Sequence, residues 1–197
     1  MKKIKWVIGI SLVLFNCGGN TPKEVQEYLI DKENGLVQTI ENEDFKIEVQ
    51  YKPQDYLVGL ENRDKKLSEE EFKEKVTEKE GLQYFNIKLI SKTGKPVLKT
   101  KLENEGEEDL RLQYYIGAFE YDLYLADGND TMPCALYHFE RTYEALPFNN
   151  ISVAFENKNH NKTDKTLLIA DRALGFELIE FTFKKEDILN VPKIKNN

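Results

Sequence analysis

From Leu82 onward, apolar and polar residues alternate with a period close to two, in short runs separated by turn residues. Successive side chains of a β-strand point to opposite faces of the sheet, so this alternation is typical of strands with one buried face. Short strands that follow one another without intervening helices favour antiparallel pairing in a sandwich of two sheets. The strands predicted here are 82–91, 111–118, 119–125, 134–141, 151–156, 166–170 and 176–183, with an acidic loop at 104–109.

The part of the chain before Leu82 combines a predicted hairpin with short helices. Residues 36–40 and 45–51 alternate around an acidic turn, as the strands of a hairpin do. Helices are predicted after Thr21 and Ser68, because a glutamate three positions later completes a capping box in each case. Two further short helices are predicted, from Pro53 and over 184–190. The sequence therefore predicts a mainly β, antiparallel β-sandwich-like single domain with a few short helical additions.

The first seventeen residues have the three zones of an export signal. Three lysines stand among residues 1–5, residues 6–15 are apolar, and Cys17 follows after one asparagine. The apolar run is about half as long as a membrane-spanning helix needs, which indicates a signal peptide. Residues 14–17, Leu-Phe-Asn-Cys, resemble the lipobox of bacterial lipoproteins. With Tyr51-Lys52-Pro53 and the stretch 133–143, the chain resembles exported lipoproteins of Gram-negative bacteria.

This resemblance implies a division of the chain and a location for the protein. In such lipoproteins the lipobox cysteine is acylated and becomes the first residue of the mature chain. The implied parts are a signal peptide over 1–16, a lipid anchor and short tether over 17–20, and a single β-rich globular domain over 21–197. In some bacteria, an aspartate directly after the lipobox cysteine resembles a signal for retention in the inner membrane. This chain has Gly18 at that position. We therefore expect the cell envelope, at the outer membrane, with the lipid bilayer as a partner through acylated Cys17.

Charge and cysteine usage narrow the classes of partner. Removing the three lysines of residues 1–16 takes the formal charge from −7 to −10. A body this acidic repels phosphate backbones, so nucleic acid is not an expected partner. The anionic body favours a basic partner, or one bridged by cations. Acylation of Cys17 would leave Cys134 as the one remaining cysteine, so no intramolecular disulfide is expected despite export.

Few residues point to catalysis. His138 and Glu140 lie two positions apart in a predicted strand, so both face the same side and could share a metal ion if another strand supplied a third ligand. The alternative is a histidine packed in a sheet beside a surface glutamate. The chain has no nucleophile elbow, phosphate-binding glycine loop or zinc-ligand spacing. We therefore predict no enzyme activity, no catalytic residue, no metal and no cofactor.

The densest mixture of aromatic, basic and imidazole side chains lies between residues 133 and 143. Such mixtures are common at interaction surfaces. The alternative interpretation is a central strand that enters an ordinary loop. The leading hypothesis is a non-enzymatic, lipid-anchored binding or accessory protein with an envelope protein as partner. A metal-dependent envelope hydrolase using His138 and Glu140, and an inhibitor or immunity-type lipoprotein, remain alternatives. The candidate interaction surface consists of Tyr137, His138, Glu140, Arg141 and Tyr143.

Overall fold

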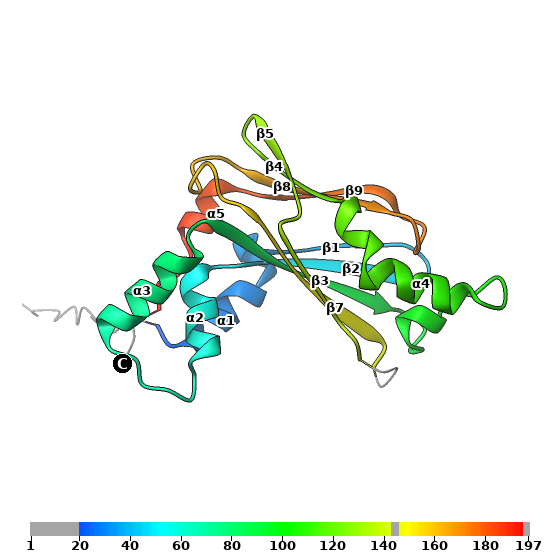
Figure 1. Ribbon diagram of the computed structural model, residues 1–197, viewed down its shortest axis with the longest axis horizontal. Coiled ribbons are helices and arrows are strands. Elements are labelled where there is room, and N and C mark those ends of the chain that lie inside the picture. The colour runs from blue at the N-terminus through cyan, green and yellow to red at the C-terminus, as the bar shows by residue number, and fades with distance from the viewer. Residues whose placement is uncertain (1–19, 143–145, 195–197) are drawn as a thin grey trace, which may run out of the picture.

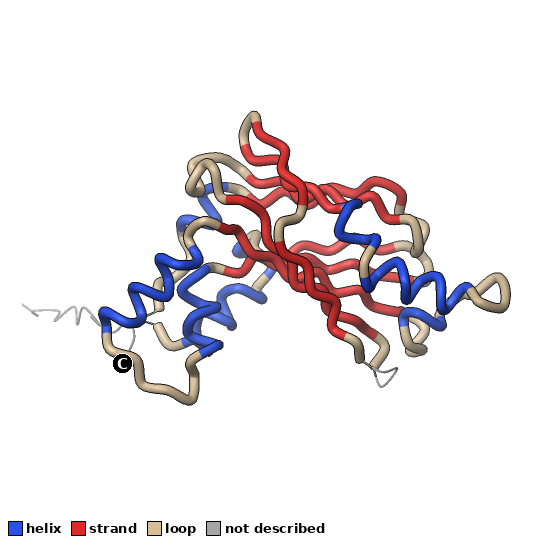
Figure 2. The backbone as a smooth tube through the Cα atoms, viewed as in Figure 1, coloured by secondary structure: helices blue, strands red, loops and turns tan. Residues whose placement is uncertain are grey.

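Two antiparallel β-sheets face each other in the computed structural model of the chain, which describes residues 20–142 and 146–194 (Figures 1 and 2). The predicted mainly β, sandwich-like fold with short helical additions is thus confirmed. Within the described residues the strands are β1 (Val37–Glu41), β2 (Phe45–Lys52), β3 (Leu82–Ser91), β4 (Leu123–Asp127), β5 (Asp130–Pro133), β6 (Leu136–Glu140), β7 (Phe148–Glu156), β8 (Lys165–Asp171) and β9 (Glu177–Phe183). The α-helices are α1 (Pro22–Ile30), α2 (Gln54–Glu61), α3 (Glu69–Lys79), α4 (Glu107–Ile116) and α5 (Lys185–Leu189), with short 3₁₀ helices η1 (Lys32–Asn34), η2 (Val97–Lys99) and η3 (Ala118–Asp122).

The larger sheet has five strands in the order β1-β2-β3-β7-β6, and every neighbouring pair is antiparallel. β2 and β3 alternate strictly between buried and half-buried residues along their whole length. One face of this sheet therefore forms part of the core, as the period of two predicted. The hairpin predicted at 36–40 and 45–51 corresponds to β1 and β2, and β3 has the predicted bounds.

The smaller sheet has four strands in the order β5-β4-β8-β9. β4 and β5 form a tight hairpin in which Asp127 pairs with Asp130. Gly128 between them has a φ of 64°, a conformation that glycine adopts without the penalty a side chain would bring.

The strand predicted over 134–141 is wrong at its start, because the chain changes sheets there. β5 belongs to the four-stranded sheet and β6 to the five-stranded sheet. The Cys134 N–H still donates to Leu123 of β4, whereas the Ala135 N–H already donates to Ala154 of β7. Pro133, at the end of β5, has no backbone N–H and cannot donate a hydrogen bond to a neighbouring strand. Apolar and polar residues nevertheless continue to alternate after it. The alternation alone therefore did not reveal that the chain passes from one sheet to the other.

The strand predicted over 111–118 is also wrong: these residues belong to α4 and the start of η3. Residues 119–125 are a strand only from Leu123 onward. The predicted acidic loop ends early, since Glu107 already begins the helix, and three acidic residues fill its first turn. Acidic side chains are favourable at a helix N-terminus because they complement the helix dipole. The acidic first turn therefore indicates the helix correctly, whereas the apparent period of two in the residues after it predicted a strand.

The helices predicted from caps have the predicted starts. Thr21 accepts from the backbone of Glu24, and Ser68 accepts from the backbone of Glu71, with both capping boxes complete. The helix predicted from Pro53 is α2, and the helix predicted over 184–190 is α5. α1, α2 and α3 lie together at one end of the molecule (Figure 1). None of the helices in the described part of the chain is long and apolar enough to cross a bilayer.

One apolar cluster between the sheets draws on both of them and on the helices. Phe85 of β3 lies at its centre: its ring contacts the rings of Tyr51 and Phe155 edge-on and that of Phe183 at a tilt, with centroids 5.3–6.1 Å apart. On one side of the sandwich, the Gln38 amide of β1 donates to Thr182 of β9 and joins the two sheets. Elsewhere α4 bridges them: Tyr115 stacks on Phe139 of β6 and lies within 3.5 Å of Asp171 of β8.

Candidate functional site

The strand β6 carries most of the candidate interaction surface, and its side chains divide between two faces. Leu136, His138 and Glu140 are exposed, whereas Tyr137 and Phe139 are half-buried. This is the alternation expected from the sequence. β6 is the last strand of its sheet, so β7 is its only strand neighbour among the described residues. Its outward side chains and its second edge are therefore located at the margin of the five-stranded sheet.

Tyr137 is directed inward and fixes α4 against the sheet. Its hydroxyl donates to the backbone carbonyl of Tyr115. Burial raises the pKa of Tyr137 well above its usual value of 10, so the phenol stays protonated and keeps this bond. Phe139, two residues along, stacks almost parallel on the Tyr115 ring at 5.9 Å. Tyr137 is therefore a supporting residue beneath the surface, and it offers little area to a partner.

His138 and Glu140 share the outward face, as predicted, and no third metal ligand joins them among the described residues. The Glu140 carboxylate accepts from the Asn150 amide at 2.9 Å across the β6–β7 pair. Residues 20–142 and 146–194 include no group of three or more His, Cys, Asp or Glu side chains that could hold a metal ion. The two side chains therefore present an imidazole and a hydrogen-bonded carboxylate to solvent.

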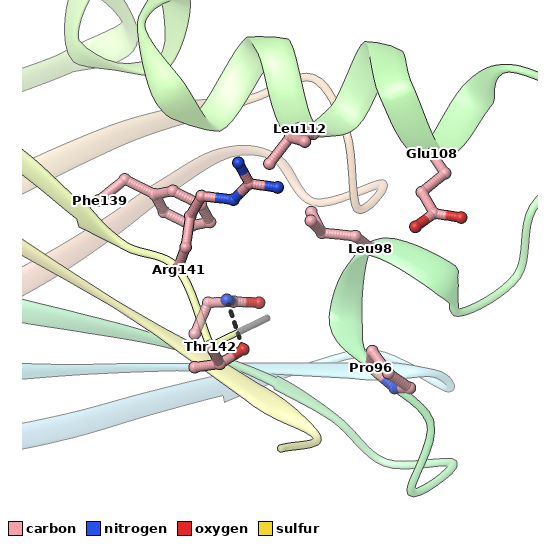
Figure 3. A pocket seen from close by; sticks show the side chains of 8 residues that line it. Pro96, Leu98, Glu108, Leu112, Phe139, Arg141 and Thr142 are labelled. Carbon is pink, nitrogen blue, oxygen red and sulfur yellow. Dashed lines mark hydrogen bonds between the residues drawn. The ribbon is translucent and has the colours of Figure 1, made fainter. Parts of the chain in front are cut away.

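Arg141 lies beside a cavity of about 250 Å³ between the end of β6, the start of β7, α4 and η2 (Figure 3). Leu98 of η2, Leu112 of α4 and Phe139 give it apolar walls. The Arg141 guanidinium extends toward Leu112, and the Glu108 carboxylate enters from the opposite end of the view (Figure 3). The cavity thus combines apolar walls with one cation and one anion, each on a different element.

The polar residues of this cavity are held by specific hydrogen bonds. The Asn149 amide donates to the Thr142 hydroxyl at 3.0 Å and reaches the Glu140 carbonyl at 3.5 Å, which joins the end of β6 to β7. Glu108 lies 3.8 Å from the Lys99 ammonium at the mouth. A cavity of this size with a guanidinium and a carboxylate suits one amino-acid side chain or a small polar group of a partner. Among its described lining residues, no nucleophile is in hydrogen-bond contact with a base.

Two candidate residues lie outside the described residues: Cys17, the predicted lipid attachment site, and Tyr143, the last member of the candidate surface. The sequence, conversely, did not indicate Leu98, Glu108 and Leu112 as lining residues. They come from η2 and α4, and α4 was predicted as a strand. The three acidic residues that follow Gly106 were the signal that could have revealed the helix and, with it, this wall.

Cys134 is half-buried where the chain passes between the sheets, with its Sγ 3.1 Å from the Leu136 carbonyl and 3.8 Å from that of Ala154. Burial raises the pKa of its thiol to about 11. We therefore expect alkylation at pH 8 to be at least about a hundredfold slower in the folded protein than in denaturant, because the thiolate is the reactive form. Iodoacetamide labelling followed by peptide mass analysis measures this, and folded and denatured rates within tenfold would contradict it.

No protein-family model, curated protein or solved structure matches the chain.

Proposed function

We propose that this protein is a lipid-anchored lipoprotein of the bacterial envelope, without enzyme activity, that binds a protein partner along β6 and the adjacent cavity. The observation that carries the proposal is the position of β6 at the margin of its sheet, with Leu136, His138 and Glu140 exposed and the Arg141 cavity beside its end. The anchor is the lipid on Cys17, proposed from the lipobox resemblance, and the outer membrane is the proposed location.

An edge strand is suited to binding an extended protein segment. Its second side presents backbone donors and acceptors that a partner strand can pair with, while neighbouring pockets select side chains. Leu136 is 54% exposed and adds apolar contact area at the start of the strand. At the other end, the cavity could accept one side chain of the partner between Arg141 and Glu108.

The electrostatics and the anchor supply affinity in different ways. The acidic body favours a basic partner, or one bridged by cations, because complementary charge speeds association. Confinement to a membrane raises the effective concentration near other membrane-bound proteins without any new contact. A modest interface on β6 would therefore suffice for binding to a partner in the same membrane.

Site-directed crosslinking tests this proposal. A photoreactive amino acid replaces His138 in the full-length protein in the bacterium, and the control carries it at Lys73, exposed on α3. We expect a discrete crosslinked protein from position 138 and none from position 73. Arg141→Glu in the same background should lower its yield at least about tenfold, as loss of an arginine hot spot does. Equal crosslinking from both positions, or no dependence on Arg141, would refute β6 as the binding site.

The identity of the captured protein then separates the related hypotheses. A membrane-bound envelope protein supports an accessory role, whereas one tightly bound soluble protein supports an inhibitor or immunity-type role. The hydrolase alternative has no support from the geometry of His138 and Glu140 within the described part of the chain. Intact mass of the membrane-extracted protein, compared with a Cys17→Ser variant, tests the anchor independently: the expected mass is that of residues 17–197 plus acyl chains, lost in the variant.

A further inference from the structure

A second cavity, of about 200 Å³, lies where the chain enters the domain. Pro22 of α1, Phe72 of α3 and Ile194 near the end of the described chain contribute apolar side chains to it, and Leu67 adds another from the loop between α2 and α3. This loop projects at the end of the molecule where α1, α2 and α3 gather (Figure 1). The cavity thus has an apolar wall and is open to solvent, and it belongs to the helical end of the domain.

The charged residues that line this cavity, Arg63 and Lys65, are both basic. Both are exposed, and neither forms an ion pair with another described residue. The other cavities described for the domain each include at least one carboxylate: Glu108 beside Arg141, Glu43 and Asp44 near Arg111, and Asp55 near His160. In an acidic protein, a cavity lined by two basic residues and no carboxylate reverses the overall charge locally; exposed Asp64 lies between the two in the sequence but does not line the cavity.

The length of the covalent chain limits how far Cys17 can be from the start of the domain. Thr21 and Pro22 line it, and only three residue steps separate Cys17 from Asn20, a span of at most about 11 Å. Asn20 itself is held to the domain, since its backbone and its side-chain amide both donate to the Lys193 carbonyl at 3.4 Å. An acyl group on Cys17 would therefore enter the bilayer close to Arg63 and Lys65.

We propose that this cavity binds an anionic phospholipid of the membrane in which the protein is anchored, with the phosphate at Arg63 and Lys65 and the apolar walls against the glycerol and upper acyl region. The proposal rests on the lipid anchor proposed above and adds an orientation to it. The helical end faces the bilayer, and β6 with its cavity stays accessible to a partner.

The two basic residues at the cavity favour this orientation locally, and the first turn of α3 beside them is acidic, with Glu69, Glu70 and Glu71. The acidic surface is repelled by an anionic leaflet, whereas each basic residue held at that surface strengthens binding about fivefold. Two such residues are too few to bind the domain to a membrane alone. Combined with an acyl anchor, which removes the cost of bringing the domain to the surface, they are sufficient to select which face points down.

The test uses the protein purified from membranes and reconstituted into phosphatidylethanolamine vesicles that contain a photoreactive phosphatidylglycerol. The variant is Arg63→Glu with Lys65→Glu. The control is Lys184→Glu with Lys185→Glu, an exposed pair outside the cavity whose reversal changes the net charge equally. We expect wild type and control to crosslink within residues 58–72, and the variant to give about tenfold less crosslinked lipid there. Thermal unfolding of all three proteins checks that the exposed substitutions leave the fold intact.

Acylated protein whose crosslinks are spread over the surface, or are unchanged by the Arg63 and Lys65 reversal, overturns the lipid site and leaves the anchor standing. Protein whose mass shows no acyl chain overturns the anchor, and the lipid site with it. Acylated protein with crosslinks confined to the cavity region, reduced in the variant and retained in the control, supports both.

Discussion

Replacing Asp127 with alanine should lower the free energy of unfolding by about 3–5 kcal/mol, one of the two largest effects we expect. The Lys165 ammonium lies 2.5 Å from the Asp127 carboxylate, and both side chains are fully buried. The substitution would leave the lysine charge in the core without a counter-ion. Chemical denaturation of the variant at pH 7 measures the loss.

The surroundings of this pair explain why it holds the sheets together. Gln83 of β3, in the five-stranded sheet, donates to the Asp127 carboxylate at 3.0 Å. Thr163, in the loop before β8, donates to it as well. Asn159 donates to the Asp127 backbone carbonyl at 2.8 Å. One carboxylate thus collects donors from both sheets and from the β7–β8 loop.

A double variant and a surface control make the interpretation specific. Asp127→Ala with Lys165→Met should be more stable than Asp127→Ala alone, because it removes the buried charge with its partner. Glu27→Ala breaks the exposed Lys23–Glu27 pair, whose side chains are 84% and 65% exposed, and should change stability by less than about 0.5 kcal/mol. Additive effects of the Asp127 and Lys165 single variants would contradict the coupling.

The pH dependence of this pair has a definite sign. Burial alone raises the pKa of Asp127, but hydrogen bonds from Lys165 and Thr163 and the charge of Lys165 outweigh it, so the pKa lies below its usual value of 3.8. The stabilisation is therefore complete above about pH 4 and is lost as the pH falls through the lowered value. The stability difference between wild type and Asp127→Ala should narrow on acidification below pH 4.

Replacing Lys52 with methionine should instead stabilise the protein at pH 7, by roughly 1–3 kcal/mol. Burial lowers the pKa of Lys52 from 10.5 to about 8, and no carboxylate among the described residues pairs with it. Its ammonium lies 5.4 Å from the centre of the Tyr56 ring, and this cation–π contact partly offsets the free-energy cost of burying the charge. Methionine keeps the apolar stem and removes the charge.

The pH profile distinguishes this mechanism from better packing. Lys52 loses its proton near pH 8 in the folded state and near pH 10.5 in the unfolded chain. The free energy of unfolding of the wild type therefore rises relative to that of the variant between these two pH values. The advantage of Lys52→Met should be constant below pH 8 and vanish by about pH 10.5. Lys73→Met, exposed on α3, is the matched control and should have little effect. An advantage that persists above pH 10.5 would point to packing instead.

The sequence predicted most of this fold because its strands are half-buried and its helices are capped. β2 and β3 have an unbroken alternation, and Thr21 and Ser68 have complete capping boxes. α4 escaped prediction because its residues also alternate at a period of two. Its buried residues, Arg111 and Tyr115, are spaced as helix neighbours, and the acidic first turn after Gly106 was the local signal that favoured the helix.

The candidate site was predicted less completely, and for a topological reason. The sequence indicated that His138 and Glu140 share a face, which is a local property of a strand. β6 lies at the margin of the sheet because β7 pairs with β6 on one side and with β3 on the other. The pairing of β7 with β3 is a long-range property of the fold. The cavity wall from α4, through Glu108 and Leu112, depends on the same tertiary arrangement.

The central pairing of β3 with β7 also sets the order in which the protein can fold. Leu82 pairs with Glu156 and Ile90 with Phe148, so the middle of the larger sheet stays open until β7 has paired with β3. Such long-range pairings are slow to form, on the order of milliseconds to seconds. During that time the apolar face of the β2–β3 pair, with Ile47, Val49 and Ile87, is exposed to other chains. The interval before β7 arrives is when aggregation would compete with folding, and additional residues between β3 and β7 would lengthen it.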